Sequence, residues 1–304
     1  MTECERIIQQ GVLPESFFRE EERCGFLVTE KRKKIWAIEL DIYLKFAEVC
    51  NKYNLKFWGD GGTLLGAVRH NGFIPWDDDM DVIMPRKDYN VLMEVGEREF
   101  SAPYFFQTPY TDSNYGYSFA KLRNTNTTCM PKVFAKAGFN HGIHIDIIPL
   151  DNISIVDGEL NYKRIRELNY DNSTYMRMNN PCLSEKDKER IRNFSGRIPK
   201  DTYEEIHKIA SLHEKESTEY VGTMVITVLD FSRKLLSAKA FKKTKYRKFE
   251  GYDIPIPIGY DCVLNTEFGN YMELPSIEER GNWHTGVYFD ADHAYMDYLN
   301  QFPE

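Results

Sequence analysis

Residues 58–84, WGDGGTLLGAVRHNGFIPWDDDMDVIM, decide the fold of this chain. The stretch opens with a glycine-rich turn, continues through a short helical pattern, and turns again at Asn71-Gly72. It closes with an acidic run at residues 77–81 that leads into the apolar strand 82–84. Helices and strands continue to alternate beyond it, which predicts a mixed sheet with helices around it.

The acidic run predicts a metal site. On an extended strand alternate side chains point to the same side, so the odd-numbered carboxylates should share one face. These are Asp77, Asp79 and Asp81. Carboxylates this close repel one another unless a cation neutralises them, and hard oxygen ligands select Mg²⁺ or Mn²⁺. Acidic runs are usually solvated loops, but this one lies between Trp76 and an apolar strand, which favours the metal site.

The glycine turn complements the acidic run. Small residues allow backbone N–H groups to approach a phosphate closely, and the N-terminus of a following helix adds partial positive charge. Gly61, Gly62 and Thr63 are therefore candidate phosphate-binding residues. A turn that holds phosphates, facing carboxylates that hold a metal, is the arrangement that phosphoryl transfer requires.

Polar residues also interrupt two later strands. Asp146 lies in an apolar segment that begins at Ile143, where burying an unpaired carboxylate would be costly. A metal, or a salt bridge to a Lys or Arg, would resolve that cost. His144 shares its face. Lys121 and Arg123 share a face of another predicted strand, where they either grip a phosphate or lie on an exposed surface.

Other polar residues have two interpretations each. Arg69 and His70 follow the glycine turn and either approach the phosphates or the acceptor, or satisfy carbonyls at a helix end. Six Lys and Arg residues between positions 239 and 248 form either a patch that docks on an anionic membrane or a solvated helix face. His207 and His213 are expected at the surface of a polar helix.

The flanking sequence predicts the organisation of the chain. Apolar residues recur at steps of three and four over residues 30–53, which predicts a helix with Thr29 as its N-cap. Residues 155–218 are polar and mostly helical in pattern. The predicted fold class is α/β (α+β), a mixed β-sheet flanked by helices and followed by a mostly helical region.

Charge and composition restrict the function. A net charge of −8 argues against a general nucleic-acid binder, because an acidic chain repels phosphates. The six cysteines are scattered without a CxxC pair, which indicates reduced thiols. No apolar run approaches the roughly 20 residues that a membrane helix needs. We therefore expect a cytoplasmic protein.

The stretch at residues 58–84 strongly resembles the LicD family, which includes the fukutin-related proteins. The shared pattern is the glycine–threonine turn, the Arg-His pair and Ile-Pro-Trp-Asp-Asp-Asp. FAKLRNT at 119–125, GIHIDIIPLD at 142–151 and the segment 249–275 also resemble family segments. The resemblance covers most of the chain from residue 30 onward and is weakest at 155–215.

The resemblance implies a nucleotidyltransferase fold, with a lead-in at 1–29, a catalytic core at 30–151 and a helical and C-terminal region at 152–304. Asp79 and Asp81 match the metal-binding pair of the family, Asp77 its companion, and Asp146 the later strand carboxylate. By this resemblance Asp79, Asp81 and Asp146 become candidate catalytic residues, and all four aspartates become metal ligands.

The resemblance also implies a function. Bacterial members are similar to phosphocholine transferases that use CDP-choline to modify cell-surface glycans such as teichoic acid or lipopolysaccharide, and eukaryotic relatives transfer ribitol phosphate. We therefore predict a Mg²⁺- or Mn²⁺-dependent transfer of a phosphoalcohol, first of all phosphocholine, from a CDP-alcohol to a glycan or lipid-linked saccharide, with release of CMP. The reaction would occur in the cytoplasm or at the inner face of the membrane. Aromatic candidates for holding choline are Trp58, Trp76, Tyr115, Tyr117 and Trp283.

Three other functions compete. Asp79-Met80-Asp81 is also a metal-binding pattern of nucleotide-sugar glycosyltransferases, although the upstream glycine turn argues against one. A nucleotidyltransferase would attach the nucleotide itself and release pyrophosphate. A catalytically inactive glycan-binding scaffold would be expected to have lost carboxylates, and the acidic set here is intact.

Overall fold

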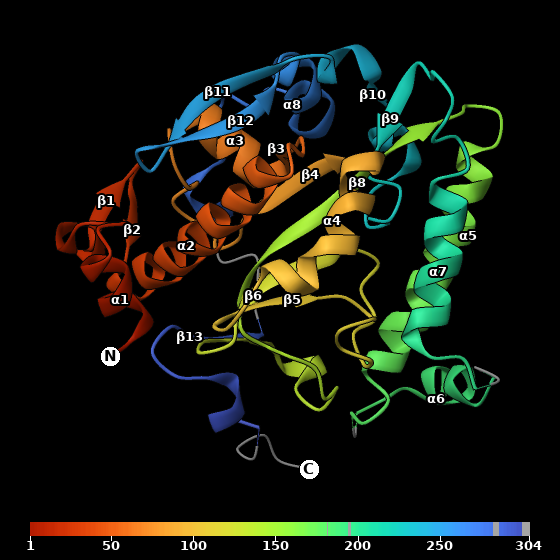
Figure 1. The fold of residues 1–304 in the computed structure, drawn as a ribbon, viewed down its shortest axis with the longest axis horizontal. Coiled ribbons are helices and arrows are strands. Elements are labelled where there is room, and N and C mark those ends of the chain that lie inside the picture. Colours follow the sequence, from red (N-terminus) through yellow and green to blue (C-terminus); the bar gives the residue numbers. More distant parts are fainter. Residues whose placement is uncertain (181, 194–195, 282–285, 300–304) are drawn as a thin grey trace.

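A mixed seven-stranded sheet forms the centre of the molecule (Figure 1). The structure is a computed structural model that describes residues 1–180, 182–193, 196–281 and 286–299. The strands follow the order β10-β9-β8-β4-β3, and β6 also pairs with β8 and carries β5 on its other edge. Their bounds are β3 (Trp58–Gly59), β4 (Asp81–Pro85), β5 (Tyr104–Gln107), β6 (Ala120–Asn124), β8 (Ile143–Ile153), β9 (Tyr220–Gly222) and β10 (Leu236–Ser237).

The strand pairing brings the two predicted acidic strands together. β4 runs parallel to β8, with Asp81 directly beside Asp146, whereas β6 lies antiparallel to β8, with Lys121 beside Asp146. Asp146 is therefore flanked by a carboxylate on one side and an ammonium group on the other. The predicted fold class, a mixed sheet with helices, is confirmed.

Three helices of the first half pack around this sheet. The predicted helix over residues 30–53 is α2 (Glu30–Lys52), and Thr29 caps it by accepting a hydrogen bond from the Arg32 backbone N–H at 3.3 Å. The glycine turn opens α3 (Gly61–Arg69), and α4 (Arg86–Glu99) follows β4. α2 contacts both β6 and β8, so the middle of this long helix lies directly behind the site.

The region after the sheet is helical, as its polar pattern predicted. It contains α5 (Gly158–Met176), α6 (Glu185–Arg192) and α7 (Pro199–Ala210), and α5 and α7 lie side by side (Figure 1). The sheet does not break at residue 151, which the resemblance implied as the end of the catalytic core. β8 continues to Ile153, and Asp151 pairs with Gly222 of β9, which returns the chain to the sheet after the helices.

The basic run at 239–248 is not a helix face, which corrects that prediction. It lies on a 3₁₀ turn (Ala238–Phe241) and on β11 (Thr244–Phe249), which forms a hairpin with β12 (Tyr252–Pro257) along the top of Figure 1. Residues 244–248 are all exposed, so the expected solvation is observed. The remaining elements are α1 (Glu3–Gln9), β1 (Glu21–Arg23), β2 (Phe26–Val28), β7 (Thr128–Pro131), α8 (Tyr260–Phe268) and β13 (Val287–Asp290).

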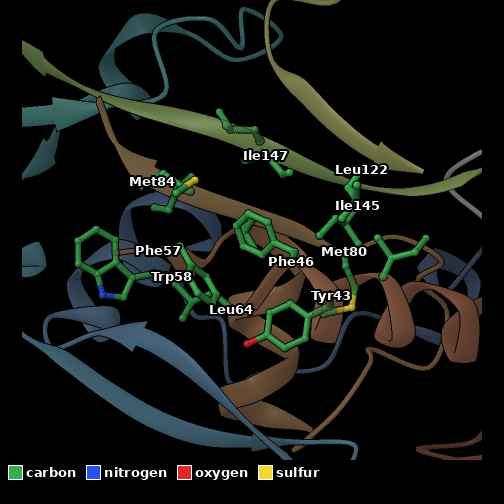
Figure 2. Packing of buried hydrophobic residues seen from close by; sticks show 14 of the residues in the cluster. Tyr43, Phe46, Phe57, Trp58, Leu64, Met80, Met84, Leu122, Ile145 and Ile147 are labelled. Carbon is green, nitrogen blue, oxygen red and sulfur yellow. The ribbon is translucent and has the colours of Figure 1, made fainter. Parts of the chain in front are cut away.

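The core explains how the acidic run is anchored. Figure 2 shows Met80 among the side chains packed between the sheet and α2, with Phe46 of α2 and Ile145 of β8 in the same cluster. Met80 is only 1% exposed. Because this side chain is fixed in the core, the carboxylates on either side of it are held at the surface of the sheet. In the described part of the chain, no helix is long and apolar enough to span a bilayer.

Candidate active site

The acidic run crosses the edge of the sheet as extended chain and enters β4 only at Asp81. Its burial alternates residue by residue. Asp78 is 6% exposed, and Met80 is almost completely covered, whereas Asp77, Asp79 and Asp81 are partly exposed. The three odd-numbered aspartates therefore share the accessible side, as the period of an extended chain requires.

The glycine turn lies against this accessible side. Gly61 has a φ of +49°, a conformation that glycine adopts without strain. A Cβ built on Gly62 would lie 2.4 Å from Asp77 Oδ2, and one built on Gly61 would lie 3.7 Å from Asp81 Oδ2. A side chain at position 62 would collide with the acidic run. The start of α3 and the carboxylates therefore face each other closely enough to contact the same ligand.

Thr63 has a different place from the one expected. It is 2% exposed, and its Oγ1 accepts a hydrogen bond from the Asp81 backbone N–H at 2.9 Å. The hydroxyl thus joins the glycine turn to the first residue of β4 instead of opening toward a ligand. Gly61 and Gly62 remain the phosphate-binding candidates of this turn.

Negative charge accumulates at this edge of the sheet. Burial, together with the neighbouring Asp79, holds the pKa of Asp77 well above its usual range. Burial likewise holds the pKa of Asp81 well above its usual range, with further contributions from Asp79, Asp146 and Asp60. Each carboxylate disfavours the charge of the next, which is the situation that a bound cation would relieve.

The donor set fits a divalent metal in its chemistry. Asp77, Asp79 and Asp81 supply the hard carboxylate oxygens that Mg²⁺ and Mn²⁺ prefer, on one accessible face. Among the described residues, however, no three His, Cys, Asp or Glu side chains are arranged to hold a metal ion as they stand. The metal therefore stays a prediction, and the three aspartates of the acidic run are the residues that would hold it.

Asp146, the fourth predicted ligand, is already paired. Lys121 Nζ lies 2.5 Å from Asp146 Oδ1 and 2.7 Å from His144 Nε2, and His144 Nε2 is 3.3 Å from the same carboxylate oxygen. The salt bridge that the sequence left open as an alternative is thus present. His144 and Asp146 share a face of β8, as their spacing predicted.

Lys121 and Arg123 do not lie on an exposed strand face, so that alternative is wrong. Lys121 is 5% exposed and Arg123 is 2% exposed. Arg123 donates to the Gly142 carbonyl at 2.5 Å and to the Gln107 side-chain oxygen, and its Nη1 lies 3.0 Å from His144 Nδ1. β6, the strand that carries both residues, is buried along its whole length, which the short apolar pattern alone did not reveal.

A cavity of about 210 Å³ opens beside these groups, and we call it the site cavity. Its lining joins the acidic run to β6 and β8 through Asp79, Lys121, Arg123 and Asp146. The rest of the lining is largely apolar and aromatic. It contains Tyr117, Cys129, Pro131, Phe139, Val287 and Phe289.

Sequence reasoning missed several residues that line this cavity, and one of them is a carboxylate. Glu39, from the middle of α2, lines it together with Asp78. The available signal was a carboxylate between Ile38 and Leu40 within the apolar half of a helix. The spacing of apolar residues shows which side of a helix faces the core, but it does not show which residues on that side face a site. Glu39 could therefore not be identified from it.

Arg69 and His70 lie at the far end of α3 from the glycine turn. A nine-residue helix separates its first and last residues by about 12 Å. Arg69 donates to the carbonyls of Tyr271 and Glu273 at 2.6 and 3.2 Å, so it anchors the C-terminal segment. Burial lowers the pKa of His70 to about 4. The expected contact with the donor phosphates is thus not supported, and carbonyl binding, the alternative, describes Arg69.

Of the proposed choline-binding rings, Tyr117 lines the site cavity. Trp58 and Trp76 are buried core residues, and the Trp58 indole N–H donates to Thr244 Oγ1 at 3.0 Å. Tyr115 is fully buried and donates to the Phe119 carbonyl. Trp283 lies outside the described residues.

Comparison with known proteins gives a consistent family. The model of the LicD/FKTN/FKRP nucleotidyltransferase domain matches residues 54–164. A Haemophilus influenzae protein, lipopolysaccharide cholinephosphotransferase LicD, is 24% identical over 250 residues, which are 81% of this chain and 92% of that protein. An uncharacterized protein of Rickettsia prowazekii is 44% identical over 66 residues, 22% of this chain and 23% of its own length. Another, from Rickettsia typhi, is 54% identical over 41 residues, 14% of this chain and 13% of its own length.

Proposed function

We propose that this chain, whose residues 54–164 match the LicD family model, transfers a phosphoalcohol, with phosphocholine as the first candidate, from a CDP-activated donor to a sugar hydroxyl. The observation that carries the proposal is the close approach of the glycine turn to the acidic run, which leaves no space for a Cβ between Gly62 and Asp77. A pyrophosphate bound there would contact backbone N–H groups and the carboxylate site together.

The acidic run has a defined place in this proposal. A divalent cation held by Asp77, Asp79 and Asp81 would neutralise the charge of the donor pyrophosphate beside three carboxylates. Gly61 and Gly62 would orient the donor through the N-terminal N–H groups of α3. The site cavity, which reaches Asp79 and Asp146, would receive the phosphoalcohol end.

The transfer itself requires attack on the phosphorus that carries the alcohol. The acceptor oxygen forms a new P–O bond, the P–O bond to the nucleoside phosphate breaks, and CMP leaves with the bonding electrons. Asp146 would take the proton of the acceptor hydroxyl. Lys121 positions Asp146 through the ion pair at 2.5 Å, and His144 supports the same carboxylate from its own strand.

The acceptor class follows from the relative's printed name. A lipopolysaccharide cholinephosphotransferase acts on a glycan, so a cell-surface glycan or a lipid-linked saccharide is the acceptor that we propose here. The exposed basic strand β11 would favour an anionic membrane surface near the reaction, and this peripheral contact is part of the same proposal.

The test is an assay of CMP release from a panel of CDP-alcohols with Mg²⁺ or Mn²⁺, with and without saccharide acceptors. We expect the Asp79→Asn and Asp81→Asn variants to lose at least about 10³-fold in rate, because removal of a metal ligand removes the charge stabilisation that the transfer needs. Glu48→Gln, a change at an exposed carboxylate of α2, is the matched control and should leave the rate unchanged.

Other outcomes favour the competing functions. Release of a nucleoside diphosphate from a nucleotide sugar would indicate a glycosyltransferase, and pyrophosphate release from a nucleoside triphosphate would indicate a nucleotidyltransferase. A protein that binds glycan but no nucleotide would be the inactive scaffold.

A further inference from the structure

Glu39 is a buried carboxylate whose position is costly for the fold. It is 2% exposed, and its Oε2 has no hydrogen-bond partner among the residues that the structure describes. Asp77, Asp78, Asp79 and Asp81 are all near enough to disfavour its charge. A carboxylate removed from water and left unpaired destabilises the folded state. A ligand that supplies positive charge would remove this cost.

The surroundings of Glu39 restrict what that ligand can be. Glu39 lines the site cavity, whose lining also carries the rings of Tyr117, Phe139 and Phe289. The divalent cation proposed above belongs with the oxygens of Asp77, Asp79 and Asp81, and the rings offer it no further ligands. A polyol would leave most of its hydroxyls without partners against these rings. A quaternary ammonium group has no N–H to satisfy and binds to ring faces and to a carboxylate.

One ring of this cavity, that of Tyr117, already contacts a cation. The Lys121 ammonium lies 4.8 Å from the centroid of Tyr117 and 5.2 Å from that of Phe119. Lys121 is also paired with Asp146, so its charge is balanced by β8 and not by Glu39. The lining therefore carries both an ammonium group and a carboxylate oxygen without a partner, and a ligand with an anionic phosphate and a cationic headgroup matches both.

The location of the cavity indicates that it would hold the alcohol end of the donor and not the nucleoside end. Its described lining includes Asp79 and Asp146, at the reacting centre of the proposed transfer, but neither Gly61 nor Gly62 of the glycine turn. The nucleoside side of the pyrophosphate is thus assigned to the turn, and the cavity lies on the side of the transferred group.

We propose that Glu39 and the rings of Tyr117, Phe139 and Phe289 form the subsite for the cationic headgroup of the transferred phosphoalcohol, and that they select a quaternary ammonium over a neutral polyol. This inference rests on the proposed function, because it names which donor that function uses. Glu39 and Phe289 lie outside residues 54–164, so headgroup selection would depend in part on α2 and β13, beyond the segment that the family model matches.

The experiment uses the full chain, the variant Glu39→Gln and the control Glu48→Gln. Steady-state CMP release is measured with CDP-choline, CDP-ethanolamine and CDP-ribitol, and thermal unfolding is followed with and without phosphocholine. Glu39→Gln should raise the KM for CDP-choline about tenfold or more, since it removes the counter-ion of the headgroup, and leave the KM for CDP-ribitol unchanged.

Thermal unfolding separates loss of binding from loss of folding. Without ligand, Glu39→Gln should unfold at a temperature equal to or higher than the wild-type protein, because the unpaired carboxylate is gone. Phosphocholine should raise the melting temperature of the wild-type and Glu48→Gln proteins and have a much smaller effect on Glu39→Gln.

Each failure has its own signature. If the wild-type protein releases CMP but prefers CDP-ribitol, or if Glu39→Gln leaves both the KM for CDP-choline and the phosphocholine shift unchanged, the subsite is wrong and the proposed transfer stands. If phosphocholine stabilises the protein through Glu39 while no CDP-alcohol yields CMP, the subsite stands and the proposed transfer is wrong.

Discussion

Two ion pairs on the same strand differ in what surrounds them. Asp146 and Asp151 both belong to β8, and each pairs with a basic residue brought from another element. Asp151 is fully buried, and Arg86 grips both of its oxygens at 2.6 and 2.9 Å. The Asp146 side chain is 20% exposed and opens on the site cavity.

A histidine accompanies each pair and strengthens the contrast. His207 lies 2.7 Å from Arg86 Nη1 and stacks on Tyr203, with ring centroids 3.9 Å apart. It is only partly exposed, and not a surface residue as the polar pattern of its helix predicted, because its ring lies against Arg86 and Tyr89 of α4. His144 instead borders the site cavity. One pair is sealed by rings and can only stabilise the fold, whereas the other can exchange contacts with a ligand.

The strongest test of this contrast is Asp146→Asn. We expect CMP release to fall by about 10²–10⁴-fold, the usual contribution of a general base, because the amide cannot take the proton of the acceptor. Stability should fall less than on loss of the fully buried Asp151, since the Asp146 side chain is 20% exposed and opens on the cavity. The measurement is kcat for CMP release together with a thermal melt, and a variant with full activity would remove Asp146 from the reaction.

The sealed pair should give the opposite result. Asp151→Asn leaves the Arg86 charge buried without its counter-ion, which should lower the free energy of unfolding by about 3–5 kcal/mol. The rate per folded molecule should be unchanged. Denaturant unfolding measures the loss of stability, and CMP release per folded molecule measures the rate.

A matched control for that variant is Asp157→Asn. Asp157 pairs with His213 at a partly exposed site, where the loss should stay below about 1 kcal/mol. If both variants lost the same free energy of unfolding, burial of the Asp151–Arg86 pair would make no difference to what the pair contributes to stability.

The smallest expected effect is a pH dependence of stability from His207. Burial, with a further contribution from Arg86, holds the pKa of His207 well below its ordinary value of 6.5. The unfolded chain therefore binds a proton at this residue before the folded chain does, and stability falls as the pH drops below about 6.5. His207→Gln should flatten this part of the profile in denaturant unfolding between pH 7 and pH 5. A profile identical to that of the wild-type protein would show that His207 does not titrate differently on folding.

Much of the local structure followed from the sequence because its signals are local. The period of three to four over residues 30–53 predicted α2. The alternation within the acidic run predicted which aspartates are accessible. The glycine turn was predicted as the start of a helix, and α3 begins there.

Predictions were wrong where the structure of a segment depends on contact with another, distant segment of the chain. The basic run was expected on a helix, but pairing with β12, which contains Pro255 and Pro257, holds it as an extended strand. Arg69 was a candidate phosphate ligand, yet it binds carbonyls of a segment about 200 residues later in the chain. In both cases a distant segment decided the outcome.

The sequence by itself determined which carboxylates share a face, where the glycine turn stands before its helix, and which family the stretch at 54–164 resembles. These properties depend on the repeat of an extended chain or a helix, and that repeat acts over a few residues. Only the tertiary structure decided that Lys121 pairs with Asp146, that Asp81 lies beside Asp146, and that Glu39 faces the site cavity. Those contacts join segments far apart in sequence, and they form because buried charges and apolar faces must find partners when the sheet and α2 pack together.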